Sequence, residues 1–123
     1  MSVPVDLTAL GAEIERFGAV AFLVTASPDG RPHVVSVAVT FAGGRLTMPA
    51  GRTARRNVTD SSAATLLWSG VPGDAYCLLV DGTARLAGDE DEVITVDPTS
   101  AVLHRLADAP DDLPSCVPVD GVE

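Results

Sequence analysis

A cluster of arginines follows a glycine in the stretch MPAGRTARRN, residues 48–57. The chain has eight basic side chains, all of them arginine, against seventeen acidic ones, and its net charge is -9. Half of the arginines nevertheless lie between Arg45 and Arg56, with no carboxylate among them. Guanidinium groups are planar forks that bind phosphate oxygens in pairs. Because an acidic chain lacks the broad basic face that nucleic acids require, we expect a smaller anion as the partner.

The backbone of the same segment also favours a phosphate site. Gly51 lets a ligand approach the main chain closely. A helix that begins here presents unpaired N–H groups and the positive end of its dipole to an anion. Thr53, the expected N-cap, adds a hydroxyl, and Arg52, Arg55 and Arg56 add their guanidinium groups. The alternative is that these arginines lie on a short surface helix and pair with the excess of carboxylates.

Few other residues suggest chemistry. Trp68 can stack on a flat ring, fill a dimer interface or pack in the core, and His33 can hydrogen-bond a ligand or close the preceding turn. His104 has no cysteine or second histidine near it in the sequence, so we predict no metal site. Cys77 and Cys116 are too few and too far apart for a disulfide framework, and we expect both to be reduced and non-catalytic. No serine–histidine–aspartate arrangement is visible, and the catalytic residues stay unassigned.

The surrounding pattern predicts one helix followed by strands. Apolar residues at three- and four-residue steps predict a helix over 7–17, with Asp6 as its N-cap and Gly18 at its end. Short apolar or alternating runs bounded by turn residues predict six strands, at 19–26, 33–41, 45–50, 63–70, 75–88 and 93–106. Gly82 suggests a bulge, Asp97-Pro98 a break in the last strand, and a short helix follows the third strand.

The run 33–41 divides into two faces at the strand period of two. One face is apolar and consists of Val35, Val37, Val39 and Phe41. The other face has smaller and partly polar side chains, those of Val34, Ser36, Ala38 and Thr40. A face of this second kind is suited to lie against something flat.

Short hairpins and scarce helices predict an all-β, six-stranded antiparallel barrel in a single domain, residues 1–123. Its core covers about 6–106, and residues 107–123 form an acidic, proline-rich tail. Side chains fill so small a barrel, so a sizeable ligand must bind outside it or between subunits. No apolar run is long enough to span a bilayer and no basic secretory n-region is present, so we expect a cytoplasmic protein without a membrane partner.

Four segments carry a resemblance to a known family: FLVTASPDGRPHVVSV, RLTMPAGRTARRNV, ATLLW and LLVDGTARLAG. In this order, and over about residues 8–106, they resemble the pyridoxamine 5'-phosphate oxidase-like family of FMN-binding split β-barrels. The resemblance implies a homodimer that holds FMN in a groove between two barrels. It places Val35, Ser36 and Val37 beside the isoalloxazine ring. It places a second set beside the ribityl chain and phosphate, namely Pro49, Ala50, Gly51, Arg52, Thr53, Arg55 and Arg56.

The chain departs from this family at its C-terminal end. Oxidases of pyridoxamine phosphate end in a basic, histidine-containing segment that grips the substrate phosphate, whereas this chain ends in DDLPSCVPVDGVE. We therefore do not expect pyridoxamine phosphate as the substrate. The leading hypothesis is an oxidoreductase that uses FMN or a deazaflavin on a small organic substrate. The alternatives are a non-catalytic protein that carries a flavin or heme, and a barrel that has lost its cofactor and serves as an interaction module.

Overall fold

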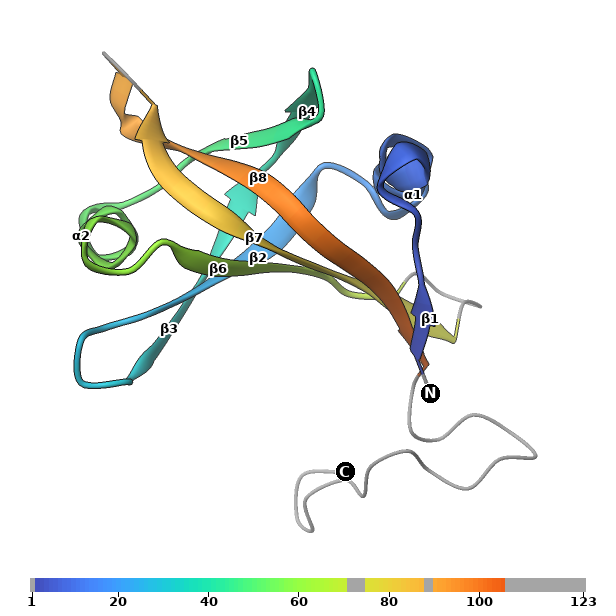
Figure 1. The fold of residues 1–123 in the computed structure, drawn as a ribbon, viewed down its shortest axis with the longest axis horizontal. Coiled ribbons are helices and arrows are strands. Elements are labelled where there is room, and N and C mark those ends of the chain that lie inside the picture. The colour runs from blue at the N-terminus through green and yellow to red at the C-terminus, as the bar shows by residue number, and fades with distance from the viewer. Residues whose placement is uncertain (1, 71–74, 88–89, 106–123) are drawn as a thin grey trace, which may run out of the picture.

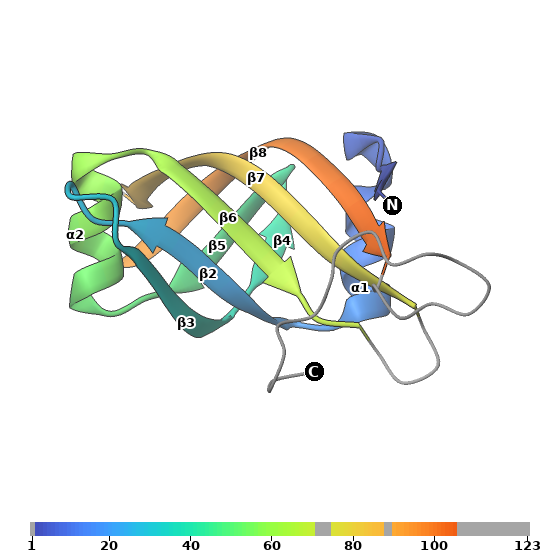
Figure 2. The ribbon, with the colours of Figure 1, turned by 90° about the horizontal axis from the view of Figure 1, so that it is seen from below.

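The fold is a single antiparallel sheet that curls around an apolar core, with a helix at each end (Figures 1 and 2). The computed structural model describes residues 2–70, 75–87 and 90–105. In chain order its elements are β1 (Ser2–Pro4), a 3-10 turn (Leu7–Ala9), α1 (Leu10–Phe17), β2 (Val20–Ala26), β3 (Pro32–Ala38), β4 (Thr40–Ala42), β5 (Arg45–Pro49), α2 (Arg52–Asp60), β6 (Ala63–Trp68), β7 (Tyr76–Ala87) and β8 (Glu90–Arg105).

The strand order explains how the sheet becomes a barrel. The order is β3-β2-β6-β7-β8-β5-β4, and β1 adds to β8. The strands at the two ends of this order, β3 and β4, are separated in sequence only by Val39. The chain therefore leaves one edge of the sheet and continues along the other, which draws the two edges together. This arrangement confirms the predicted all-β barrel with minor helix.

The predicted strand 33–41 is two strands, because its halves pair with different partners. β3 pairs with β2, and β4 pairs with β5. The chain bends at Val39, whose N–H donates to the carbonyl oxygen of Ala19 at 2.7 Å. Its side chain is only 7% exposed, so the bend is held from inside the barrel.

The two predicted faces of this segment are confirmed. The side chains of Val37 and Val39 are buried and those of Val35 and Phe41 are half-buried. The alternate side chains, those of Val34, Ser36, Ala38 and Thr40, are exposed on the outer face. The alternation survives the bend because each half keeps its inner face toward the same core.

The interior of the barrel is filled with side chains from the central strands. The fully buried apolar residues of β2, β5, β6, β7 and β8 are Leu23, Leu46, Met48, Leu66, Trp68, Leu78, Val80, Ile94 and Val96. Burying a leucine or isoleucine of this kind contributes roughly 1.5–3 kcal/mol relative to leaving it in water. The barrel thus has a packed interior, and the ligand-accessible surfaces lie outside it.

Three details differ from the sequence-based expectation. The last strand is continuous, so the predicted break at Asp97-Pro98 is wrong; the register shifts instead between Asp81 and Gly82, opposite an extra residue, Thr99. β1 was not predicted, and it forms by pairing with residues 102–104 of β8. The first helix opens with a 3-10 turn, which Asp6 caps as predicted by accepting from the N–H of Thr8.

Some expectations lie outside the described residues. They are the tail at 107–123, including Cys116, and the loop at 71–74. Within the described ranges, no helix has the length and apolar character needed to cross a membrane.

Gly82 is required by the close approach of β8. A Cβ added here would lie 2.5 Å from Cγ1 of Val96 and 2.6 Å from the carbonyl oxygen of Asp97. The predicted bulge near Gly82 is therefore confirmed, and the missing side chain is what lets the two strands meet.

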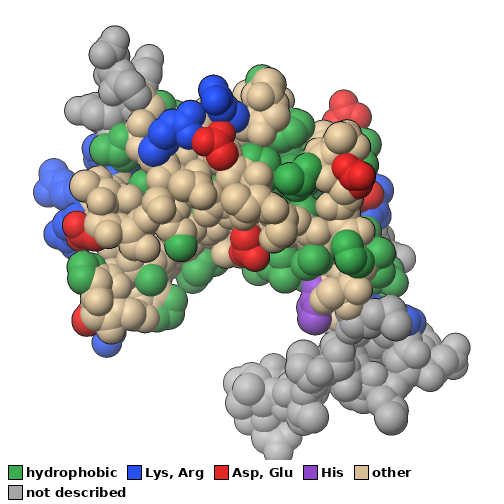
Figure 3. Space-filling view, viewed as in Figure 1, with side chains coloured by type: hydrophobic (Ala, Val, Ile, Leu, Met, Phe, Trp, Pro, Cys, Tyr) green, Lys and Arg blue, Asp and Glu red, His purple; other side chains and the backbone are tan. Residues whose placement is uncertain are grey.

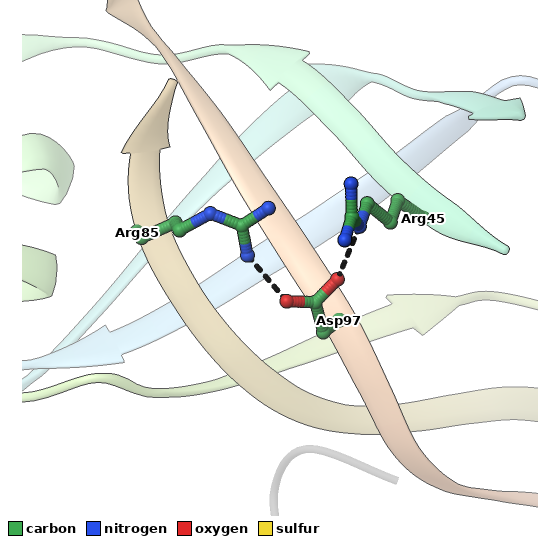
Figure 4. Close-up of polar contacts among 3 residues, drawn as sticks. All are labelled: Arg45, Arg85 and Asp97. Carbon is green, nitrogen blue, oxygen red and sulfur yellow. Dashed lines mark hydrogen bonds and ion pairs between the residues drawn. The ribbon is translucent and has the colours of Figure 1, made fainter. Parts of the chain in front are cut away.

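Charged side chains lie on the outside of the barrel. On the face drawn in Figure 3, cationic side chains gather beside α2 and over the upper strands. One ion-pair cluster joins β5, β7 and β8 (Figure 4). Nε of Arg45 donates to Oδ1 of Asp97 at 2.9 Å, and Nη1 of Arg85 donates to Oδ2 of the same carboxylate. These hydrogen bonds, first of all that from Arg85, lower the pKa of the Asp97 carboxyl.

We predict that Gly82→Ala destabilises the protein by about 1–3 kcal/mol, because overpacking forces the backbone of β8 to shift. Urea unfolding would measure the change. The matched control is Gly51→Ala, where the new Cβ meets nothing within 4 Å, and it should cost under about 1 kcal/mol. Equal losses for the two variants would contradict the assigned contact.

We also predict that Arg85→Gln raises the pKa of Asp97 toward its ordinary value, because the variant lacks the charged donor. The lowered pKa means that this carboxylate stabilises the fold above its unfolded-state pKa, and that the contribution is lost as pH falls through the folded-state pKa. Carboxyl NMR titration of both proteins would measure the shift. Arg16→Gln, whose arginine pairs with Glu13 on α1, should leave the Asp97 titration unchanged.

Candidate functional site

The start of α2 brings the predicted phosphate-binding residues to the end of β5. The helix covers Arg52–Asp60, and its N-cap is Gly51 in extended conformation. The prediction of Thr53 as N-cap is therefore wrong: Thr53 is already the second helical residue. No side chain caps this helix, and its first turn contains no acidic residue. The first N–H groups thus have no side-chain competitor for an anion.

The arginines of α2 differ in their exposure to solvent and therefore in their access to a ligand. Arg52 and Arg56 are exposed, as is Thr53. Arg55 is half-buried, and its Nε donates to the carbonyl oxygen of Ala50 at 3.0 Å. Arg55 therefore helps to hold the turn between β5 and α2. The two exposed guanidinium groups are the stronger candidates for an anion that approaches from solvent.

The inner face of α2 explains why these arginines have a fixed position. Ala54 and Val58 are buried against the barrel, and α2 contacts β2, β3, β7 and β8. Asn57 is 2% exposed and donates through Nδ2 to Oγ1 of Thr25 at 3.1 Å. A buried amide that satisfies a buried hydroxyl specifies one orientation of the helix, because any rotation would leave both groups unpaired.

The remainder of the predicted segment lies at the strand end. Pro49 is exposed and pairs in register with Val93, and the N–H of half-buried Ala50 donates to the carbonyl oxygen of Glu92 at 3.0 Å. Gly51 is exposed, with open space around its Cα. Arg45 belongs to the same stretch of sequence but faces Asp97 at the other end of β5, so it does not join the arginines of α2.

The predicted ring-contacting residues of β3 point in two directions. Val37 is 5% exposed and lies in the core, and Val35 is half-buried on the same side. Ser36 is exposed on the outer face, opposite Phe22 of β2. Of the three, Ser36 alone has an exposed side chain on the outer face, Val35 is partly accessible, and Val37 is limited to its main-chain atoms.

Trp68 packs inside the barrel and is fully buried. Its Nε1 donates to the carbonyl oxygen of Gly18 at 2.9 Å. Gly18 ends α1 with a φ of 103°, a conformation that favours glycine. The indole therefore ties the end of α1 to β6, and its ring does not reach the surface of the protein.

His104 has a cysteine neighbour that the sequence does not reveal. Cys77 lies directly opposite it across β7 and β8, and Nδ1 of His104 lies 3.2 Å from Oγ of Ser2. Burial raises the pKa of the Cys77 thiol, which disfavours the nucleophilic thiolate. Among the residues that the structure describes, no group of three or more His, Cys, Asp or Glu side chains could hold a metal ion. His33 is half-buried at the start of β3.

The outer face of the sheet carries an apolar row that sequence reasoning did not single out. Phe22 pairs in register with Leu67, Leu67 with Leu79, and Leu79 with Val102. We call these four residues the outer row. Phe22 is 39% exposed, and its neighbours Val20 and Val34 are 65% and 56% exposed. Each residue follows the period of two, but only the register shows that they adjoin across four strands.

The geometry can be compared with known proteins. Among solved structures, a putative pyridoxamine 5'-phosphate oxidase from Listeria innocua is similar, with a TM-score of 0.66 and 20% identity over 79% of this chain and 96% of that one. An F420 reductase has a TM-score of 0.55 and 18% identity over 68% and 88% of the two chains. An FAD binding protein from Mycobacterium smegmatis has a TM-score of 0.62 and 13% identity over 85% and 100%.

These likenesses show a shared fold, the split barrel. No curated protein matches the sequence closely enough to count as a relative. The family model described as pyridoxamine 5'-phosphate oxidase, however, matches residues 11–115. That span includes all of α1 except Leu10, both halves of the divided strand, α2 and the long strands β7 and β8. The chain therefore belongs to the pyridoxamine 5'-phosphate oxidase family.

Proposed function

We propose that this protein binds FMN or a deazaflavin coenzyme and acts as an oxidoreductase on a small organic substrate. The observation that carries the proposal is the start of α2, where exposed Arg52 is the first helical residue, exposed Arg56 follows one turn later, and no side chain caps the first N–H groups. An oxyanion placed there gains charge-assisted hydrogen bonds and the favourable end of the helix dipole. The phosphate of the coenzyme is the group that this site would hold.

The main chain at Gly51 and the outer face of β3 also fit such a coenzyme. Gly51 has no atom within 4 Å of the position of a Cβ, so a phosphate oxygen can reach the main chain. From there the coenzyme would extend toward the outer face of β3, where Ser36 offers a hydroxyl and Val34 and Ala38 offer apolar surface. A bound flavin or deazaflavin supplies hydride transfer, and the protein then has only to position and shield it.

A second copy of the chain would complete the site. The outer row aligns apolar side chains from four strands; Phe22, the cross-strand neighbour of Ser36, is exposed, and Leu67, Leu79 and Val102 are half-buried. A contiguous apolar surface of this kind marks an interface, because it costs free energy while it faces water. We propose that two copies bury their outer rows against each other, so that a groove for the coenzyme forms beside Ser36.

The second candidate is a non-catalytic flavin carrier on the same fold. A solved structure that is similar to this chain bears the name FAD binding protein. Reduction of the bound coenzyme by a candidate substrate would distinguish the enzyme from the carrier.

We predict that Arg52→Ala and Arg56→Ala each weaken FMN binding by about tenfold or more, the usual effect of losing a hydrogen bond to a charged group. Riboflavin, which lacks the phosphate, should bind both variants almost as it binds the unchanged protein. Flavin fluorescence titration would measure both affinities.

The control for these variants is Arg16→Ala, which removes the same charge from α1 and should leave FMN affinity unchanged. Equal losses for FMN and riboflavin would refute the phosphate role of α2. Titrations with the deazaflavin coenzyme and with heme would identify the preferred cofactor. Absence of binding to all three would leave the interaction module as the remaining hypothesis.

We further predict a dimer that Phe22→Glu dissociates, because the variant places a carboxylate within the apolar outer row of an already acidic protein. Light scattering at micromolar concentration would measure the mass of both proteins. Thr40→Glu adds the same charge on the exposed outer face of β4, outside the row, and should remain dimeric. A monomeric unchanged protein would contradict the proposed interface.

A further inference from the structure

A separate depression lies on the outer face of the barrel, where β2, β6 and β7 run side by side near the end covered by α2. Its volume is about 410 Å³. Its walls are mostly small and apolar, and one carboxylate lines it; the residues that matter here are Val24, Ala26, Pro32, Ala63, Thr65 and Asp81. None of the arginines of α2 lines it, so it is distinct from the proposed phosphate site.

The carboxylate of Asp81 is held in place by its neighbours. The hydroxyl of Thr65, which is its partner in register across β6 and β7, donates to Oδ1 of Asp81 at 2.6 Å. The hydroxyl of Thr99 donates to the main-chain oxygen of Asp81 at 3.1 Å. Among the described residues this carboxylate has a hydroxyl partner but no cationic one. It therefore retains acceptor capacity and an unpaired negative charge.

The backbone around the depression is irregular in a way that shapes it. The register between β7 and β8 shifts between Asp81 and Gly82, and Thr99 is the extra residue. Gly82 has no room for a side chain against Val96 and Asp97, so the two strands approach closely directly beside the carboxylate. Bulges re-aim neighbouring side chains and recur next to binding sites. The bulge, the oriented carboxylate and the depression are three observations at one place.

We propose that this depression binds a small organic cation, a primary ammonium group attached to a short apolar body. The ammonium group is a compact charge with three donors, which suits the free acceptor positions of Asp81. The apolar body packs against the small side chains of Val24, Ala26, Pro32 and Ala63. The site does not depend on the proposed coenzyme or on the arginines of α2.

Benzylamine is a suitable probe, because it is cationic at pH 7 and its ring is apolar. Titration of the full-length protein, followed by the amide NMR signals of Thr65, Asp81 and Gly82, should give saturable shifts. Benzyl alcohol has the same body without the charge and should bind at least about tenfold more weakly, the usual effect of losing a charge-assisted hydrogen bond. Comparable binding of the two compounds would overturn the proposal.

Two variants separate the charge from the shape. Asp81→Asn should weaken benzylamine binding about tenfold or more. The control is Asp60→Asn, which removes an exposed carboxylate at the end of α2, outside the depression. This variant should bind benzylamine as tightly as the unchanged protein. Ala26→Leu keeps the carboxylate but fills the depression, so it should also abolish binding, and it serves as the test if Asp81→Asn does not fold. Unchanged affinity in Ala26→Leu, or in a folded Asp81→Asn, would show that the depression is not the site.

Discussion

The packed interior of the barrel is the constraint on which the remaining features depend. Leucine, isoleucine and tryptophan side chains from five strands fill it, with Leu23, Leu66 and Ile94 fully buried. Side chains that point inward are therefore buried in the core. The groups that can contact a ligand lie on the outer face or at an end of the barrel. The curl of the sheet, whose edge strands β3 and β4 are joined through Val39, enforces this division, because it turns one face of the sheet toward the core.

The two helices close the ends of the barrel, and each is tied to the sheet by one polar contact, which is part-buried at α1 and buried at α2. Trp68 donates to Gly18 at the end of α1, and Asn57 donates to Thr25 beneath α2. The contact between Asn57 and Thr25 bears on the candidate site, because it fixes α2 and with it the positions of Arg52 and Arg56. An acidic protein thereby keeps these two arginines in a fixed position at one end of the barrel.

The outer face of the sheet is divided into regions of different chemistry. The outer row of Phe22, Leu67, Leu79 and Val102 is apolar and suits a second copy. One step further along the same strands, Thr65 and Asp81 replace the apolar pair, and the depression begins there. Arg45, Arg85 and Asp97 form an ion-pair cluster across β5, β7 and β8. Since exposed pairs of this kind contribute little net stability, we assign the cluster no functional role.

Features that depend on neighbouring residues could be predicted from the sequence. The two faces of 33–41, the end of the first helix at Gly18 and the irregularity at Gly82 follow from side-chain period and glycine geometry, which are local properties. Thr53 is not the N-cap because α2 begins one residue before it, at Arg52, after Gly51 in extended conformation; the sequence pattern places a helix start here only to within a residue or two.

Features that depend on pairing partners could only be found in the tertiary structure. The strand at 33–41 divides at Val39 because its two halves meet β2 and β5, which are far apart in sequence. Arg45 is close to the arginines of α2 in sequence but lies apart from them in the fold, where it pairs with Asp97 across β5 and β8. The outer row and the Cys77–His104 pair exist only through the register of the sheet. The sequence by itself thus determined which side chains of each strand point inward and which segment concentrates arginines behind a glycine. The folded sheet decided which outward side chains lie together, because long-range hydrogen bonds, not local preference, set the register.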